Sequence, residues 1–353
     1  GPRDGFTEQL LVNLSLIRRR VTSADLKFQY RYIGRVTKTK VCICYLKNIA
    51  SDQIVKELEH RLNELDIDGI VDSGYIQEMI KDSPFSPFDT IGYSERPDSI
   101  VGKLLEGRVA LVVDGSPFVL TVPFVFPELF QTPEDYYNNF IFASFNRLLR
   151  IFGAVLALFV PAIYVSLTNF HQELLPTPLL LSIAAGRYDV PFPTVIEAFL
   201  MLIVFEILRE AGARMPTAIG QTVSIVGALV LGEAAVDAKF IAPSMIIIVA
   251  LTGISALMNA KVQGAILVLR FVFLILAAFM GIYGVIFGAL CLVTHLMSIR
   301  SFGVPYMLTE GSIRYEDIKD TLIRAPWWYM RLRPQLIASK NRTRMGRHAK
   351  KGT

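Results

Sequence analysis

Residues able to carry acid–base, nucleophilic or metal chemistry are few in this sequence and do not form a catalytic pattern. The 353-residue chain has four scattered histidines, at His60, His171, His295 and His348. It contains no phosphate-binding glycine loop, no Gly-x-Ser-x-Gly elbow and no His-Glu-x-x-His helix. We therefore expect the histidines to be structural or solvated, and the sequence predicts no enzyme, no cofactor and no metal centre.

Two smaller groups of reactive residues lead to the same interpretation. The acidic cluster Asp66, Asp68 and Asp72 could hold a cation, but the other ligands of a calcium loop are missing and a solvated turn is favoured. The chain has three cysteines: Cys42 and Cys44, two apart on one strand face, and Cys291 in an apolar segment. This pattern excludes a disulfide framework and indicates a reduced compartment.

Charges inside apolar segments are the more informative chemistry. A charged side chain at the centre of a bilayer costs about 2.5–3.5 kcal/mol, so Glu197, Glu206 and Arg270 each require a reason to be there. Glu206 precedes Arg209 by three residues on one helical face, which predicts a structural ion pair near the inner interface. Arg270 is expected to pair with Glu197 or Glu206 from another helix.

The apolar segment 218–236 is rich in small and hydroxylated residues. Small residues permit close helix approach, so one interpretation is a packing seam. The other is a pore wall, in which a ring of subunits would present a polar ring, an apolar constriction and an acidic mouth. The helical face that would line the pore comprises Thr222, Val226, Leu229 and Glu233. A more polar alternative face comprises Gln221, Ser224 and Ala228.

The composition of the chain indicates that its apolar segments, with the charges inside them, form membrane helices. Hydrophobic residues make up 52% of the chain and charged residues 19%, below the roughly 25% of soluble domains, and the mean hydropathy is +0.44. Residues 1–150, 151–299 and 300–353 carry net charges of −2, −1 and +8. The sequence therefore predicts a soluble front, a membrane middle and a basic tail.

Several patterns in the front indicate an α/β layer. Apolar spacing and turn residues predict a helix over 7–21, a buried strand over 41–46, a helix over 51–65, a proline-rich loop over 83–97 and a hairpin of strands 109–113 and 118–122 around Asp114-Gly115. Thr132-Pro133-Glu134-Asp135 then predicts the start of a helix that runs toward the bilayer. The chain does not begin with Met and its first twenty residues carry charge, so we expect an N-terminally truncated front domain without a cleavable export signal.

The middle of the chain predicts five or six membrane spans. The crossings are expected over 151–170, 193–208, 218–236, 240–259, 262–281 and 283–298, with the short segment 174–187 re-entrant or interfacial. Gly281 and Gly284 could separate the last two spans or leave one kinked helix. The flanking cations fit a cytoplasmic front and a cytoplasmic tail, which favours an even number of spans.

The fold class predicted from these patterns is an α/β cytoplasmic domain followed by an all-α multi-pass membrane bundle. Its expected parts are the soluble α/β domain 1–131, an interfacial helix 132–150, a transmembrane bundle 151–299 and a basic cytoplasmic tail 300–353.

Short motifs along nearly the whole chain resemble one known family, the A subunits of GerA-type spore germination receptors. The matching stretches include Gly1-Pro2-Arg3-Asp4-Gly5-Phe6, Asp66-Ile67-Asp68-Gly69-Ile70, Ser86-Pro87-Phe88, Asp114-Gly115-Ser116-Pro117-Phe118, Arg209-Glu210-Ala211-Gly212-Ala213-Arg214-Met215-Pro216 and Ala325-Pro326-Trp327-Trp328. Such subunits usually carry a further soluble segment before the Gly-Pro-Arg motif, and this sequence starts at that motif.

The resemblance implies a multi-pass subunit in the inner membrane of an endospore. Its implied partners are a transporter-like B subunit that senses nutrient and a lipoprotein C subunit, and its implied activity is to oligomerise and pass monovalent cations when germinant binds. A late-sporulation paralogue of the same family fits equally well. Two other functions stay open: a secondary transporter acting alone, motivated by Glu197, Glu206 and proline-broken segments, and a non-conducting membrane scaffold.

Overall fold

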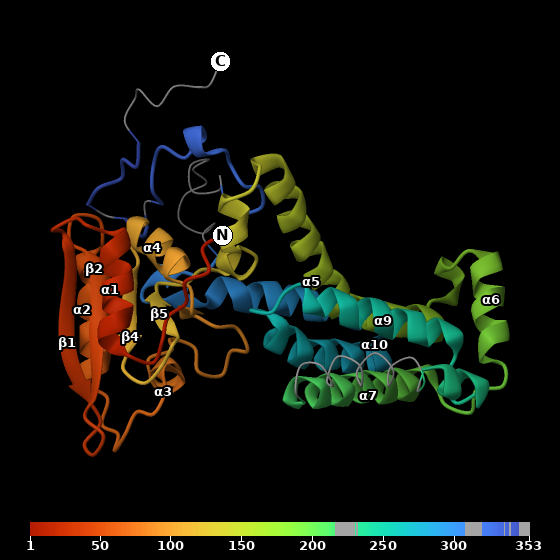
Figure 1. Cartoon of the computed structure of the whole chain (residues 1–353). Helices are drawn as coiled ribbons and strands as arrows, with labels where there is room; N and C mark the ends of the chain where they lie inside the picture. Colours follow the sequence, from red (N-terminus) through yellow and green to blue (C-terminus); the bar gives the residue numbers. More distant parts are fainter. Residues whose placement is uncertain (216–229, 231, 308–319, 335, 339, 346–353) are drawn as a thin grey trace. The chain divides into compact units, whose positions relative to one another are not determined.

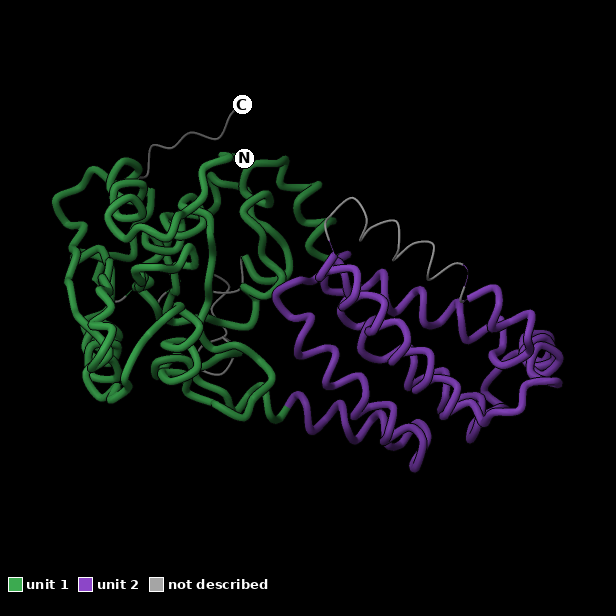
Figure 2. Tube along the Cα trace, turned by 60° about the horizontal axis from the view of Figure 1, so that its bottom comes forward, with its two compact units in different colours: residues 1–148, 294–353 green, residues 149–293 purple. Residues whose placement is uncertain are grey.

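The structure is a computed structural model that describes the chain except residues 216–229, 231, 308–319, 335, 339 and 346–353 (Figure 1). It forms two compact units, coloured separately in Figure 2. One unit joins residues 1–148 to residues 294–353, and the other comprises residues 149–293.

The first unit is built on one antiparallel five-stranded sheet. Its strands are β1 (Leu26–Ile33), β2 (Thr39–Leu46), β3 (Gly92–Ser94), β4 (Val109–Val113) and β5 (Val119–Val122), in the order β1-β2-β4-β5-β3. The central strands β2 and β4 are apolar at successive positions instead of alternate ones, because helices cover both faces of the sheet.

Each face of this sheet has its own hydrophobic core. Helices α2 (Asp52–Asn63) and α3 (Ser73–Met79) pack on one face, where Leu58 and Ile76 belong to the same hydrophobic core as Ile43 of β2. Helices α1 (Leu10–Arg20) and α4 (Pro97–Leu105) pack on the other, against the side that carries Cys42 and Cys44. The alternation of β2 side chains between the two cores confirms the predicted α/β class.

The front differs from the sequence prediction in several details. The connection between β4 and β5 has five residues, one more than the predicted strands 109–113 and 118–122 leave between them, and Gly115 adopts the predicted positive φ, of +87°. The supposed loop 83–97 contains the edge strand β3, which was missed because three residues are too few to show a period.

The predicted helix at Thr132 is wrong as a continuous element. Thr132 does cap a turn, and its Oγ1 donates to Asp135 Oδ1 over 3.1 Å, but this turn is the isolated 3₁₀ helix η2 (Pro133–Tyr136). A separate helix, α5 (Phe140–Asn169), begins after Asn139, whose Oδ1 accepts a hydrogen bond from Ile141 N. The second cap interrupts the helix because asparagine competes for backbone hydrogen bonds.

Apolar helices make up the second unit and continue into the first at both ends. Besides α5 they are α6 (Thr177–Arg187), α7 (Thr194–Arg214), α9 (Pro243–Leu257) and α10 (Gln263–Ser298), and α7, α9 and α10 run alongside one another in Figure 1. The described residues also contain short elements: η1 (Phe126–Leu129), η3 (Gln172–Leu174), β6 (Arg300–Ser301), β7 (Val304–Pro305) and η4 (Trp327–Tyr329), and residues 232–237 are helical.

Two helices in the described parts of the chain are long and apolar enough to cross a membrane, α5 and α10. The predicted five or six spans are therefore not confirmed. α7 has sufficient length but carries several charges, and α9 has only 15 residues. A membrane crossing needs about 20 residues of low charge. α7 is too charged and α9 is too short to meet this requirement.

α10 is not one straight helix but a helical hairpin. Gly281 interrupts it with φ +60° and ψ −142°, a conformation essentially restricted to glycine. A Cβ on Gly284 would lie 2.3 Å from the Leu276 carbonyl oxygen, and a Cβ on Gly288 would lie 2.7 Å from the Leu276 side chain. Since residues eight or more apart are distant along a straight helix, the limbs on either side of Gly281 fold back against each other.

Candidate functional site

Three charged side chains meet inside the helical unit. Glu206 of α7 lies between two arginines: its Oε1 is 3.2 Å from Arg270 Nη1 on α10, and its Oε2 is 2.6 Å from Arg209 Nη2 one helical turn away. Arg270 is only 1% exposed, and its Nε donates to the Ala157 carbonyl oxygen of α5 over 3.0 Å. The arginine therefore joins three helices.

The arrangement answers the question that the sequence left open about Arg270. Of the two predicted partners it pairs with Glu206, and the predicted pairing of Glu206 with Arg209 is present as well. A buried charge that is paired and hydrogen-bonded no longer carries the full desolvation cost. These contacts orient the helices, and no substrate is needed to account for them.

Glu197 has a different environment near the other end of α7. It is fully buried, and its Oε1 accepts a hydrogen bond from Ala242 N at the start of α9 over 2.5 Å. Its Oε2 lies 3.4 Å from Arg187 Nη1, an ion pair without a hydrogen bond. Glu197 therefore satisfies an N-terminal amide of α9 and interacts with its positive helix end.

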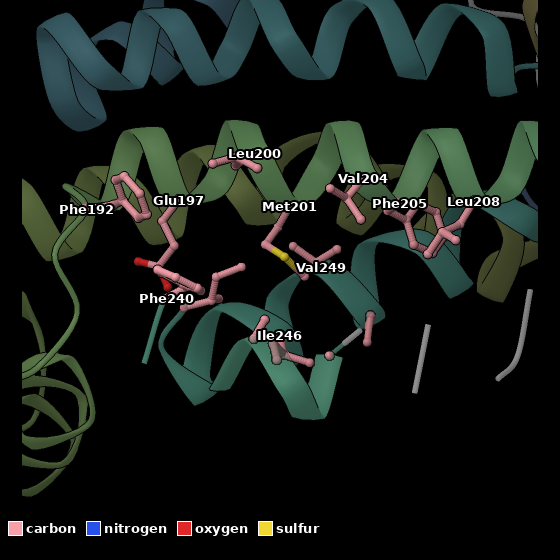
Figure 3. Close-up of a pocket in the computed structure, with 14 residues that line it drawn as sticks. Phe192, Glu197, Leu200, Met201, Val204, Phe205, Leu208, Phe240, Ile246 and Val249 are labelled. Carbon is pink, nitrogen blue, oxygen red and sulfur yellow. The ribbon is translucent and has the colours of Figure 1, made fainter. Parts of the chain in front are cut away.

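A cavity of about 460 Å³ lies beside Glu197, between α7 and α9. Figure 3 shows Glu197 at one end, beside Phe192 and Phe240, and Leu208 at the other end. Apart from that carboxylate, the described lining residues are apolar, including Met201 and Val249. An apolar space with a single charged group at one end has the character of a small-molecule pocket.

Most of the predicted pore residues lie outside the described residues. This applies to Thr222, Val226 and Leu229 and to the alternative face of Gln221, Ser224 and Ala228. Glu233 is described: it is helical and exposed. Both the pore wall and the packing seam therefore stay predictions.

A buried charge cluster in the first unit was missed by the sequence analysis. Arg108 Nη2 lies 2.7 Å from Glu128 Oε1, and Lys103 Nζ lies 3.1 Å from Glu128 Oε2. Burial raises the pKa of Glu128, but the charges of Arg108 and Lys103 outweigh it and hold the pKa below its ordinary value. Glu128 also accepts from Val125 N, so the cluster fixes the turn that follows β5.

A second missed cluster connects the tail to the start of α5. Arg147 has no exposed side-chain surface and lies between two carboxylates, 3.3 Å from Asp135 Oδ2 and 2.9 Å from Asp320 Oδ1. Tyr136 Oη donates to Asp320 Oδ2 over 2.5 Å, and Trp327 Nε1 donates to the Tyr136 carbonyl oxygen. The tail is thus held against η2 and α5 by hydrogen bonds that no local sequence pattern signals.

The described histidines and the acidic cluster Asp66, Asp68 and Asp72 do not assemble into a reactive site. His60 pairs with Glu64, His295 bonds to Ser86, His171 lies near Glu173, and His348 is outside the described residues. Asp72 caps α3 through Gly74 N, Asp68 accepts from Gly69 N, and Asp66 pairs with Arg35. Within the described ranges no three His, Cys, Asp or Glu residues are grouped so as to hold a metal ion.

The chain combines an α/β domain with long apolar helices, and the described charges inside those helices are paired. These features are typical of a membrane-associated protein. The model of the family "Bacillus/Clostridium GerA spore germination protein" matches residues 1–336. The chain belongs to the GerA family, and the resemblance seen in its motifs is confirmed.

Individual relatives cover the chain almost completely. Spore germination protein KA of Bacillus subtilis (strain 168) is 46% identical over 349 residues, 98% of this chain and 64% of the relative. The "uncharacterized membrane protein YfkQ" of the same organism is 45% identical over 343 residues, 97% of this chain and 67% of the relative. This chain therefore spans about two thirds of the length of these relatives.

One solved structure is similar over part of the chain. It is the N-terminal domain of the A subunit of the Bacillus megaterium spore germinant receptor GerK3, with 47% sequence identity, and the match covers 35% of this chain and 98% of that one with a TM-score of 0.29.

Proposed function

We propose that this chain is the A subunit of a nutrient germinant receptor that acts in spore germination. The observation that carries the proposal is the family match over residues 1–336, together with relatives that are named as spore germination proteins. The family is named for germination and not for catalysis, which agrees with a protein that signals or conducts.

In this proposal the subunit lies in the inner membrane of the spore, with its α/β domain and its basic tail on the cytoplasmic side. Support comes from α5 and α10, which have the length and hydropathy of membrane spans, and from the excess of cations at the expected inner connections. The proposed partners are a transporter-like B subunit and a lipoprotein C subunit, of which the B subunit senses nutrient.

The proposed activity is passage of monovalent cations through a ring of A subunits. Thr222, Val226 and Leu229 would face the pore, and Glu233 would form an acidic ring at its mouth. Glu233 is exposed within the single chain, as a residue facing a space between subunits must be. Germinant binding would favour the open ring only if the partners contact the open and closed arrangements differently.

A second function is favoured by the cavity beside Glu197. A secondary transporter acting alone would need a substrate space within one chain, and the 460 Å³ cavity with one buried carboxylate offers such a space. In that case Glu197 would bind the cationic group of a substrate or carry its coupled proton.

The two functions differ in which carboxylate matters. The test is potassium flux from liposomes that contain the purified receptor, comparing Glu233→Gln and Glu197→Gln with the control Glu210→Gln, an exposed residue paired with Arg214. The channel predicts germinant-dependent flux whose cation preference falls in Glu233→Gln alone. The transporter would be favoured if liposomes containing the A subunit alone show saturable potassium flux and if Glu197→Gln abolishes that flux.

A further inference from the structure

The loop between α3 and β3 presents a fully exposed aromatic side chain. Phe85 is 100% exposed, and its neighbours Pro84 and Pro87 are exposed as well, whereas Ser86 and Phe88 are buried. Residues 83–88 carry no charge. The loop therefore holds a small apolar tip away from the protein, where its side chains do not gain the stabilisation that burial provides.

Hydrogen bonds hold this loop against the segment that ends α10. Ser86 Oγ lies 3.0 Å from His295 Nε2, in the last turn of the helix. Two further bonds follow the helix end: Phe302 N donates to Asp82 Oδ2 over 2.9 Å, and Ser301 Oγ donates to the Thr90 carbonyl oxygen over 2.6 Å. Both sides of the loop are thus fixed next to the point where α10 stops.

That point corresponds to a membrane surface if α10 crosses a bilayer. The second limb of α10, from Ile282 to Ser298, has 17 residues and is about 25 Å long. The hydrocarbon core of a bilayer is about 30 Å thick, so the limb has no excess length and its last turn must lie at the interface. Exposed apolar side chains continue into that turn, with Val293 49% and Met297 41% exposed.

We propose that the tip Pro84–Pro87 is a membrane anchor whose Phe85 ring enters the headgroup region of the lipid surface around α10. This inference rests on the membrane placement in the proposed function. Lipid is favoured as the occupant because the tip is held at the level where the apolar surface of α10 ends. It also offers no charge with which a protein partner could be selected, and aromatic rings prefer this interface.

The test measures depth with a nitroxide label on the full chain in vesicles of phosphatidylcholine and phosphatidylglycerol. The variant Phe85→Cys is labelled in a Cys291→Ser background, because Cys291 is exposed while Cys42 and Cys44 are buried. Val36→Cys, 79% exposed between β1 and β2, is the matched aqueous control. Phe287→Cys, 58% exposed on the second limb of α10, is the membrane control.

The anchor predicts that the Phe85 label collides less with a water-soluble nickel chelate than the Val36 label does, by about threefold or more, and more with oxygen. Equal nickel accessibility at both positions would overturn it. Shielding from both nickel and oxygen would also overturn it, because that indicates a protein contact. If the Phe287 label is also accessible to nickel, the membrane placement itself fails; if it is not, failure at Phe85 concerns the anchor alone.

Discussion

Arg270 and Glu206 form an ion pair between α10 and α7, with Nη1 and Oε1 3.2 Å apart and the arginine almost completely buried. The pair joins two segments that are 64 residues apart in sequence. Removing one partner leaves the other charge buried without its full compensation, which is the costly outcome for a buried pair.

We expect Arg270→Met to lower the free energy of unfolding by about 3 kcal/mol, because Glu206 retains only Arg209 and loses its partner on α10. The double variant Arg270→Met/Glu206→Leu should recover part of that loss, since no unpaired buried carboxylate remains. Thermal unfolding of the detergent-solubilised chain measures both. Strictly additive losses in the double variant would show that the two side chains are not coupled.

The helical hairpin of α10 predicts a different outcome for two glycines of the same helix. Gly284→Ala should destabilise the protein by about 1–3 kcal/mol, because its Cβ would meet the Leu276 carbonyl oxygen of the facing limb. Gly264→Ala is the control, since nothing lies within 4 Å of its Cβ and alanine favours helix by up to about 1 kcal/mol. Equal tolerance of both substitutions in thermal unfolding would argue for a straight helix.

The buried cluster around Glu128 predicts a pH dependence of stability. Burial raises the pKa of Glu128, but Arg108 and Lys103 lower it further, so the folded chain holds this proton less tightly than the unfolded chain does. The stabilisation by Glu128 is then complete above the unfolded pKa of about 4.3 and declines as the pH falls through the lower folded value.

The corresponding measurement is the difference in free energy of unfolding between wild type and Glu128→Gln from pH 6 to pH 3. We expect this difference to shrink below about pH 4.3. The exposed Glu78→Gln serves as a control for the loss of a surface carboxylate. A difference between wild type and Glu128→Gln that stays constant with pH would exclude a lowered pKa at Glu128.

The proposed pore face of Thr222, Val226, Leu229 and Glu233 predicts altered conduction in two variants. Val226→Ala should leak cations without nutrient, because a smaller ring side chain widens an apolar constriction that closes by excluding water. Glu233→Gln should reduce cation preference by removing the acidic ring. Cation flux from liposomes measures both effects. If Val226→Ala does not leak cations, the result would favour the face of Gln221 and Ser224 as the pore wall, or a role of this segment in helix packing.

The sequence predicts those parts of the fold that show a helical period or an unbroken apolar run. α2 was predicted from the period of its apolar side chains, β2 from a short apolar run, and α5 and α10 from long uncharged segments. The edge strand β3, three residues long, and the break before α5 were missed, because each depends on contacts of single residues. β1, α3 and α4 were not predicted either.

Long-range charge pairs could be predicted only where few partners exist. In the apolar middle, Arg270 had two candidate carboxylates, and the structure selects Glu206. In the charge-rich front and tail, Arg147 had many candidates, and its pairing with Asp320, 173 residues away, depends on the tertiary fold. The hairpin at Gly281 lies between these cases: two glycines indicated either two separate helices or one kinked helix, and the contacts of Gly284 and Gly288 with Leu276 favour two limbs that fold back on each other.

The native mass of the detergent-solubilised chain tests whether it forms a pore between subunits, because such a pore requires a closed ring. We predict a discrete closed oligomer, and cross-linking between Glu233→Cys positions of neighbouring subunits would place that residue at the shared axis. A strict monomer would contradict the proposed pore, leave Val226 and Glu233 as helix-packing residues and favour a transporter with its site beside Glu197.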